Sequence, residues 1–113
     1  MRIKSAAVFA RAFKEGRRLH GGAWTFVVVP NGLEHARLGT AISRRVAGNI
    51  VQRNRLKRLL REMFRHAQQE LPAVDIIALA RAGVGDRNND ENRQTIEELL
   101  TKVRAECAVS SSE

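Results

Sequence analysis

Apolar side chains recur every three or four residues through the middle of the chain, and this spacing constrains the fold more than any other feature. At about 100° per residue they fall within a stripe roughly 140° wide, enough to seat a helix on a sheet. The stripe consists of Leu56, Leu59, Leu60, Met63 and Phe64. The pattern predicts a helix over about 48–70 that begins at Gly48 or Asn49, and Pro72 marks its end.

The side of this helix next to the apolar stripe is basic. The same projection groups one amide with four cations: Asn54, Lys57, Arg58, Arg61 and Arg65. Arg53 lies at the edge of this group, and Arg55 lies on the far flank of the helix. Planar guanidinium groups grip phosphate oxygens through paired hydrogen bonds, and the amide of Asn54 both donates and accepts. A merely solvated face would interleave acids with the bases, whereas only Glu62 does so here.

The same segment has the largest excess of positive over negative charge in the chain. Residues 43–66 hold eight basic side chains and one acid, or +7 of the total of +8, whereas residues 67–113 carry −4. Charge so concentrated predicts a polyanion bound at one place, and nucleic acid is the favoured polyanion. A membrane is disfavoured, because no apolar run approaches the roughly 20 residues needed to span one.

Upstream of the long helix, the sequence predicts a short helix and a set of strands. The helix is expected over 5–15, with Ser5 as N-cap and with Gly16 placed to end it. Two or three strands follow, because β-forming residues are concentrated at 24–29 and again at 37–43, with a turn at 30–32 between them.

Downstream of the long helix, the sequence predicts one buried strand and a final helix. The apolar run at 74–80 is typical of a strand covered on both faces. The final helix is expected over 91–106, with Asn89 or Asp90 as its N-cap. The whole chain, 1–113, is therefore expected to form one nucleic-acid-binding α+β domain, ordered over about 2–105 and frayed over 108–113.

The sequence also predicts a cytoplasmic protein. Cys107 is the single cysteine and has no partner for an internal disulfide, which fits a reducing compartment. Arg11 and Lys14 interrupt the stretch in which a signal peptide would stay apolar. We therefore expect no membrane partner.

The order of several motifs resembles one known family, the protein subunit of bacterial ribonuclease P. The family's core pattern is a basic pair followed by RNR-x-KR-x-x-RE-x-FR, and it corresponds here to Arg44, Arg45 and residues 53–65. Further similarity lies in the F-x-x-x-F pair before a glycine (Phe9, Phe13 and Gly16), in RLG at 37–39 and in LPAVDIIALARAGV at 71–84. The similarity covers about residues 2–105, nearly the whole chain.

The resemblance implies both a fold and a function. The fold is α-β-β-β-α-β-α, like the second domain of ribosomal protein S5, with a left-handed crossover that carries the basic helix. In the function it implies, a catalytic RNA uses Mg²⁺ to remove the 5′ leader of precursor tRNA, and the protein, inactive alone, contacts both RNAs. The implied RNA-binding residues are Arg44, Arg45, Arg53, Asn54, Arg55, Lys57, Arg58, Arg61 and Arg65. No metal site on the protein and no obligate protein partner is implied.

The resemblance also implies a cleft for the single-stranded leader between the first helix and the sheet. The residues that would line it are Phe9, Phe13, Thr25 and Val27. Spacing alone would favour core positions for the two phenylalanines. On the second strand, either the face of Trp24, Phe26 and Val28 or the alternate face looks into the cleft. The sequence leaves this choice open, although the bulkier set more naturally fills the core.

The residues themselves form no constellation for protein-based nuclease chemistry. His20, His35 and His66 lie in different predicted elements, and the acids near Asp86 lack the glycine-centred pattern of a calcium site. Two rival functions remain open: a structural ribosomal protein, and a DNA-binding module with its basic helix in a major groove. Two observations discriminate between these rivals and the ribonuclease P function. One is which RNA co-purifies with the protein, and the other is whether the protein prefers duplex DNA or structured RNA.

Overall fold

The computed structural model describes residues 6–111, apart from the side chains of Arg44 and of residues 106–111. Its elements follow the predicted order α-β-β-β-α-β-α, with a short helix and 3₁₀ turns added between them. The helices are α1 (Ala6–Glu15), α2 (Arg44–Ala47), α3 (Ile50–Ala67) and α4 (Asn89–Ser111). The strands are β1 (Arg17–Gly21), β2 (Trp24–Pro30), β3 (Arg37–Ala41) and β4 (Val74–Ala80). The 3₁₀ turns are η1 (Gln68–Glu70) and η2 (Val84–Asp86).

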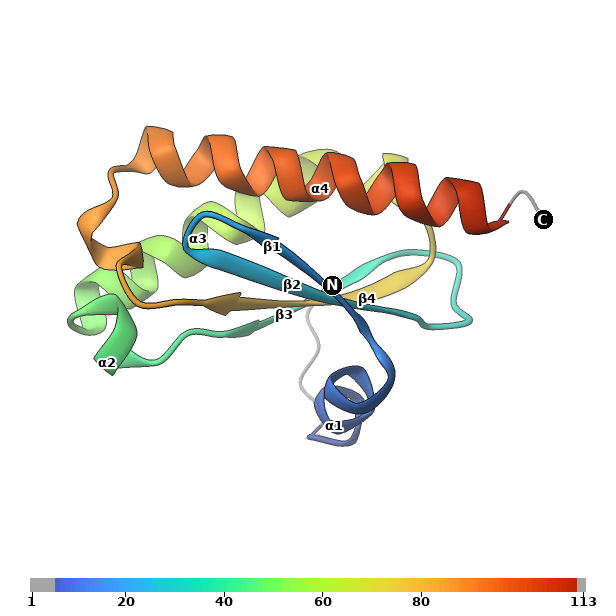
Figure 1. Ribbon diagram of the computed structural model, residues 1–113, viewed down its shortest axis with the longest axis horizontal. Coiled ribbons are helices and arrows are strands. Elements are labelled where there is room, and N and C mark those ends of the chain that lie inside the picture. The colour runs from blue at the N-terminus through green and yellow to red at the C-terminus, as the bar shows by residue number, and fades with distance from the viewer. Residues whose placement is uncertain (1–5, 112–113) are drawn as a thin grey trace.

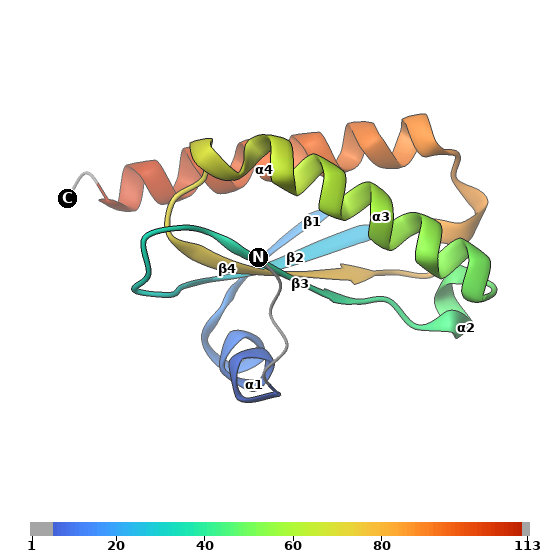
Figure 2. The same cartoon turned by 180° about the vertical axis from the view of Figure 1, so that it is seen from behind.

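The strands form one mixed sheet in the order β1-β2-β4-β3. β2 pairs antiparallel with β1 and with β4, whereas β3 and β4 are parallel and are connected through α2 and α3. α3 and α4 cover one face of the sheet, and α1 lies on the other (Figure 1). With α3 toward the viewer and the parallel strands pointing up, β4 lies to the left of β3 (Figure 1, Figure 2). The crossover is therefore left-handed, as the resemblance implies.

Alternate residues of β2 face two separate cores, because successive side chains of a strand point to opposite faces. The larger core, shared with α3 and α4, takes Trp24, Phe26 and Val28. The smaller core, shared with α1, takes Val27 and Val29. The choice that the sequence left open is thus decided: the bulkier set faces α3 and α4, and the set with Thr25 and Val27 faces α1.

A close approach at Gly16 seats α1 on the sheet. A Cβ atom there would lie 2.5 Å from Cγ1 of Val27 and 2.4 Å from the carbonyl oxygen of Ala12. The N–H of Gly16 donates to that same carbonyl at 2.7 Å and ends the helix. The predicted end of the first helix is confirmed, whereas its predicted N-cap, Ser5, lies outside the described residues.

α3 begins as predicted and ends earlier than predicted. Oδ1 of Asn49 accepts the N–H of Gln52 at 2.9 Å, which makes Asn49 the N-cap. The α-helix stops at Ala67, and the residues up to Glu70 form the 3₁₀ turn η1 instead. Pro72 keeps the residue before it out of the helical region, so the chain tightens its last turn and leaves toward β4.

The N-cap of α4 is Asn88, and the predicted choice of Asn89 or Asp90 is wrong. Oδ1 of Asn88 accepts the N–H of Glu91 at 2.8 Å, and the Glu91 carboxylate accepts the N–H of Asn88 at 3.1 Å. This reciprocal pair of hydrogen bonds is a capping box, and it places the N-cap one residue before Asn89, the earlier of the two predicted positions. α4 also runs to Ser111, so the predicted frayed tail is helical up to that residue, because 89–111 contains no Gly or Pro to stop the helix.

A buried carboxylate ties three segments together at one end of the sheet. Asp75 on β4, with a side chain only 1% exposed, accepts two 2.8 Å hydrogen bonds from Nε and Nη2 of Arg37 on β3. Asn31, which follows β2, donates a third at 3.0 Å. Burial by itself raises the pKa of Asp75, but these hydrogen bonds and the charge of Arg37 outweigh it and hold that pKa below its usual value. The pair locks the register of β3 against β4.

Candidate nucleic-acid interface

α3 presents its basic side to solvent while its apolar stripe is buried. Leu56, Leu59, Leu60 and Phe64 are buried and Met63 packs partly against them, so the predicted seat of this helix on the core is confirmed. Four exposed residues, which we call the arginine face, are Asn54, Arg58, Arg61 and Arg65. Together with Glu62 they line a shallow hollow of about 430 Å³. Guanidinium groups so arranged can grip consecutive phosphates of one strand.

The structure does not bring all of the predicted basic residues to this face. Arg53 and Lys57 are half-buried, unlike the exposed members of the arginine face. Arg55 lies on the far flank, where Nη1 donates to Oδ1 of Asn89 at 2.8 Å. Because this bond links α3 to the start of α4, the geometry separates Arg55 from the arginine face.

The basic pair that precedes α3 lies on the short helix α2, which the sequence analysis did not predict. Arg45 is exposed, and the side chain of Arg44 lies outside the described residues. A Cβ atom at Gly85 would lie 2.7 Å from the carbonyl oxygen of Ala47, so η2 packs directly against the end of α2. This close packing holds the basic pair beside the start of α3.

The four residues predicted to bind the leader differ greatly in accessibility. Phe13 is 40% exposed and Phe9 is half-buried, with ring centroids 6.4 Å apart. Thr25 is 4% exposed, and its Oγ1 lies 3.0 Å from Nδ1 of His20. Val27 has no exposed surface, because α1 lies directly on it. Of the four, Phe13 offers the most surface to a ligand, and Val27 offers none in this arrangement.

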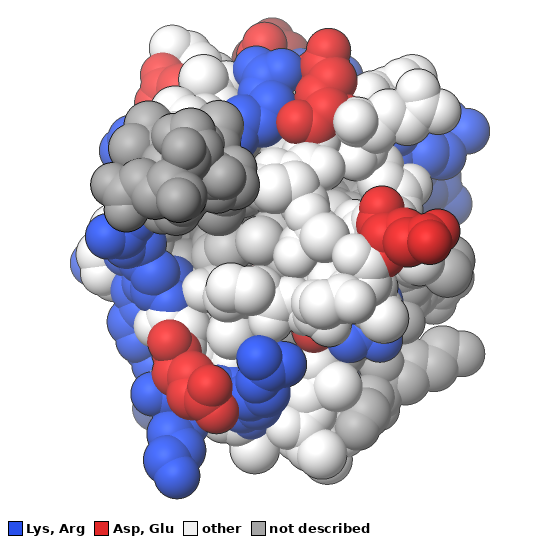
Figure 3. Space-filling view, turned by 90° about the vertical axis from the view of Figure 1, so that its right-hand side faces the viewer, with Lys and Arg blue, Asp and Glu red and all other residues white. Residues whose placement is uncertain are grey.

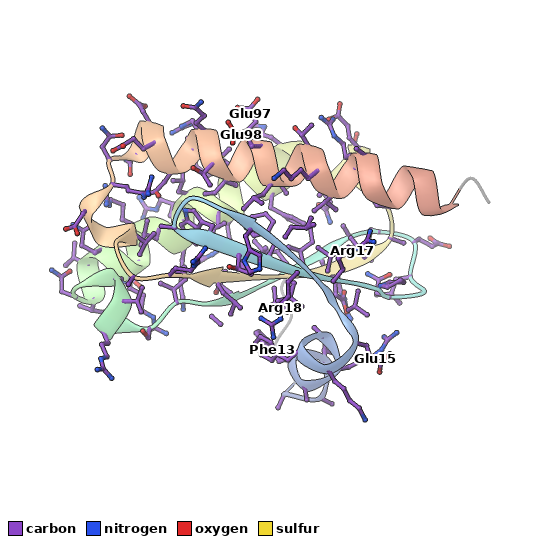
Figure 4. All side chains as sticks on the ribbon, viewed as in Figure 1. Phe13, Glu15, Arg17, Arg18, Glu97 and Glu98 are labelled. Atoms are coloured by element: carbon purple, nitrogen blue, oxygen red, sulfur yellow. The ribbon has the colours of Figure 1, made fainter. Side chains whose placement is uncertain are left out.

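Arg18 lies beside Phe13 on the α1 side of the sheet, and the sequence did not mark it as a candidate. Its guanidinium carbon lies 5.9 Å from the centre of the Phe13 ring, a cation–π contact between β1 and α1. Figure 4 shows the two side chains close together beside α1. The adjacent pair Arg17 and Arg18 after the helix-ending glycine was the available signal, but only the sheet topology brings it to the phenylalanine.

Comparison with known proteins identifies the family that has this fold and this basic helix. The family model for ribonuclease P matches residues 1–104. The chain belongs to the ribonuclease P family. The ribonuclease P protein component of Coxiella burnetii (strain Dugway 5J108-111) is 33% identical over 111 residues, which are 98% of this chain and 92% of that protein.

Solved structures of ribonuclease P proteins share the fold. The Staphylococcus aureus RNase P protein superposes with a TM-score of 0.83 at 33% identity, covering 88% of this chain and 92% of that one. The RNase P protein from Thermotoga maritima gives a TM-score of 0.80 at 28% identity, covering 91% of this chain and 97% of that one. The chain is therefore a protein subunit of the endoribonuclease that processes the 5′ end of tRNA, and an RNA subunit is its partner.

Charge is distributed unevenly over this ribonuclease P protein. Glu97 and Glu98 point outward from α4, away from the sheet (Figure 4). Seen from the end that carries the β2–β3 loop, the surface has a broad uncharged centre, with basic side chains gathered along one edge and acids scattered (Figure 3). None of the described helices is long and apolar enough to cross a bilayer.

Proposed function

We propose that the arginine face binds the RNA subunit of ribonuclease P, and that the α1 side of the sheet binds the 5′ leader of precursor tRNA. The exposed row of Arg58, Arg61 and Arg65 is the observation that carries this proposal. Their spacing of three and four residues keeps the guanidinium groups on one side of a helix whose other side is fixed in the core. A rigid row of this kind suits the backbone of a folded RNA, which is recognised largely through phosphate and ribose contacts.

On the α1 side, we propose that a nucleotide of the leader stacks on Phe13. Single-stranded nucleic acids bind proteins through aromatic rings that stack on bases and through cations that contact phosphates. Phe13 supplies the exposed ring, and Arg18, 5.9 Å from its centre, supplies the adjacent cation. Phe9 packs beside the Phe13 ring, with ring centroids 6.4 Å apart, and we propose a supporting role for Thr25 and Val27 rather than direct contact.

We further propose that the magnesium ions used in cleavage are held by the RNA subunit. In the described part of the chain, no three His, Cys, Asp or Glu side chains lie close enough to hold a metal ion. The described residues therefore offer no ready-made cage of protein ligands, and the phosphates of the RNA are the natural ligands for Mg²⁺. The protein would contribute positive charge and RNA positioning, and we propose that it does so in the cytoplasm.

Cleavage assays with purified components test this function. The protein with precursor tRNA and Mg²⁺ should give no cleavage, because the proposal assigns the chemistry to the RNA subunit and its magnesium ions. The RNA subunit alone should be slow at low Mg²⁺, and adding the protein should restore cleavage at the mature 5′ end, since its cations take over part of the screening of phosphate charge. Robust cleavage by the protein alone would contradict the proposal.

Replacing Phe13 with alanine should weaken binding of leader-bearing precursor tRNA to the holoenzyme by roughly 5- to 100-fold, the usual range for losing one stacked base. The half-exposed ring contributes little to the core, so the variant should fold normally. Mature tRNA is the control, and its affinity should not change. Binding is measured for both RNAs with wild-type and variant holoenzyme, and an equal loss for both would contradict leader stacking at Phe13.

A further inference from the structure

Two bulky apolar side chains stand exposed at the start of α3. Ile50 is 52% exposed and Val51 is 72% exposed, although both belong to residue types usually found in cores. They follow directly on the N-cap Asn49, at the end of the molecule where α2 and α3 meet (Figure 2). Neither side chain belongs to either of the two hydrophobic cores.

Local physical chemistry opposes apolar residues at these two positions. The first turn of a helix favours acids or small polar residues, because its unpaired N–H groups carry partial positive charge. The first turn of α3 contains no acid. Isoleucine and valine are also weaker helix formers than unbranched residues. Positions that break several local rules at once, with no gain in packing, are expected where a ligand binds.

The pair extends the arginine face toward the N-terminus of the helix. At about 100° per residue, Ile50 and Val51 fall on either side of the direction of Asn54, which is one turn further along. Arg58 and Arg61 continue the same side by further turns, and the exposed Arg45 lies on the helix just before. An apolar pair bordered by cations fits RNA, because nucleotides offer apolar base and ribose surfaces between their phosphates.

We infer that Ile50 and Val51 pack against an unstacked base or a ribose of the RNA subunit when the arginine face binds its phosphates. This inference rests on the function proposed above and adds a contact of a different kind. Apolar packing releases no counterions from RNA, so its contribution to affinity is the same at every salt concentration. That property separates it experimentally from the contacts made by arginines.

The test is the affinity of the full chain for its RNA subunit, without substrate, across a series of monovalent salt concentrations. The double variant Ile50→Ser, Val51→Ser should bind about tenfold more weakly at every salt concentration, with an unchanged slope of log K against log salt. Leu33→Ser is the matched control, since Leu33 is 43% exposed in the β2–β3 loop, and it should bind as the wild type does. Circular dichroism of each variant confirms that the fold is retained.

The outcomes separate the inference from the function on which it rests. Wild-type affinity in the double variant, or a reduced slope without an offset, would overturn the inference while leaving the proposed function intact. So would a wild-type dimer that the double variant loses, because a second copy would then be the occupant. Failure of the wild-type chain to bind the RNA subunit at all would overturn both.

Discussion

Replacing Arg58, Arg61 and Arg65 together with alanine should weaken binding of the RNA subunit by roughly two to three orders of magnitude at 0.1 M monovalent salt. Each phosphate contact contributes about 0.7 to 0.9 to the slope of log K against log salt, so three lost contacts should flatten the slope by about two to three. The fold should survive, because all three side chains are exposed and alanine is a better helix former than arginine.

A second triple variant controls for the loss of charge as such. Arg93, Lys102 and Arg104 lie on α4, and replacing them with alanine changes the net charge by the same amount. Because the outer side of α4 also carries Glu97 and Glu98, we expect only a small, salt-sensitive loss of affinity there. Filter binding or fluorescence titration over a salt series measures both variants. Equal effects of the two triples would mean that overall charge, rather than the arginine face, binds the RNA.

The elements that could be predicted from sequence are those whose signal is local and periodic. The stripe from Leu56 to Phe64 repeats at helical spacing, so it specified both the existence of α3 and the side that faces the core. The continuous apolar run of β4 was equally clear, since a strand covered on both faces has no polar alternation to confuse it. The arginine face followed from the same projection, because its members share one helix.

The parts that could not be predicted depend on contacts between distant segments. Arg55 was assigned to RNA with its neighbours, but the nearby start of α4 offers it Asn89, which no helical projection includes. Val27 was assigned to the leader cleft, but α1 approaches so closely at Gly16 that it covers this side chain completely. The contact of Arg18 with Phe13 likewise needs the register of β1 beside β2 and the placement of α1.

The second large effect is expected from Arg37→Ala, which should lower the free energy of unfolding by about 3 kcal/mol, the lower end of the range for breaking a buried ion pair. The lower end applies because the Arg37 side chain is itself 27% exposed. In this variant the buried carboxylate of Asp75 loses both hydrogen bonds from Arg37 and keeps the one from Asn31. Small domains have about 5 to 15 kcal/mol of stability in all, so this variant should unfold at markedly lower urea concentration.

Trp24 makes this measurement direct. It is the single tryptophan, it has no exposed surface, and its Nε1 donates to Asn92 at 3.1 Å, so its fluorescence reports global unfolding. Arg104→Ala is the control, because the ion pair of Arg104 with Glu70 at 2.6 Å is well exposed. Exposed pairs contribute about 0 to 1 kcal/mol, so this variant should be nearly as stable as the wild type. A similar loss in both variants would contradict a special role for the buried pair.

The pH dependence of the difference follows from the pKa of Asp75. In the wild type this pKa lies below the usual 3.8, so the pair stabilises the fold fully above about pH 4 and loses its effect as pH falls through the folded-state pKa. In Arg37→Ala, burial is opposed mainly by the hydrogen bond from Asn31, so the pKa of Asp75 should rise relative to the wild type. The cost of the buried charge then disappears on acidification, so the stability gap between variant and wild type should narrow from pH 7 to pH 3.

The double variant Arg37→Ala, Asp75→Asn tests why Arg37→Ala is destabilising. It shows whether the cost comes from the buried Asp75 charge that is left without its partner. Asparagine keeps the oxygen that accepts from Asn31 but removes the buried negative charge. The double variant should therefore be more stable at pH 7 than the sum of the two single losses, by about 0.5 to 3 kcal/mol, the usual range of coupling for residues in contact. The free energy of unfolding of the wild type should decrease as the pH falls below about 4, whereas that of the double variant should not show this decrease. Strict additivity of the two single losses would mean that Arg37 stabilises the sheet through packing of its aliphatic stem and not through Asp75.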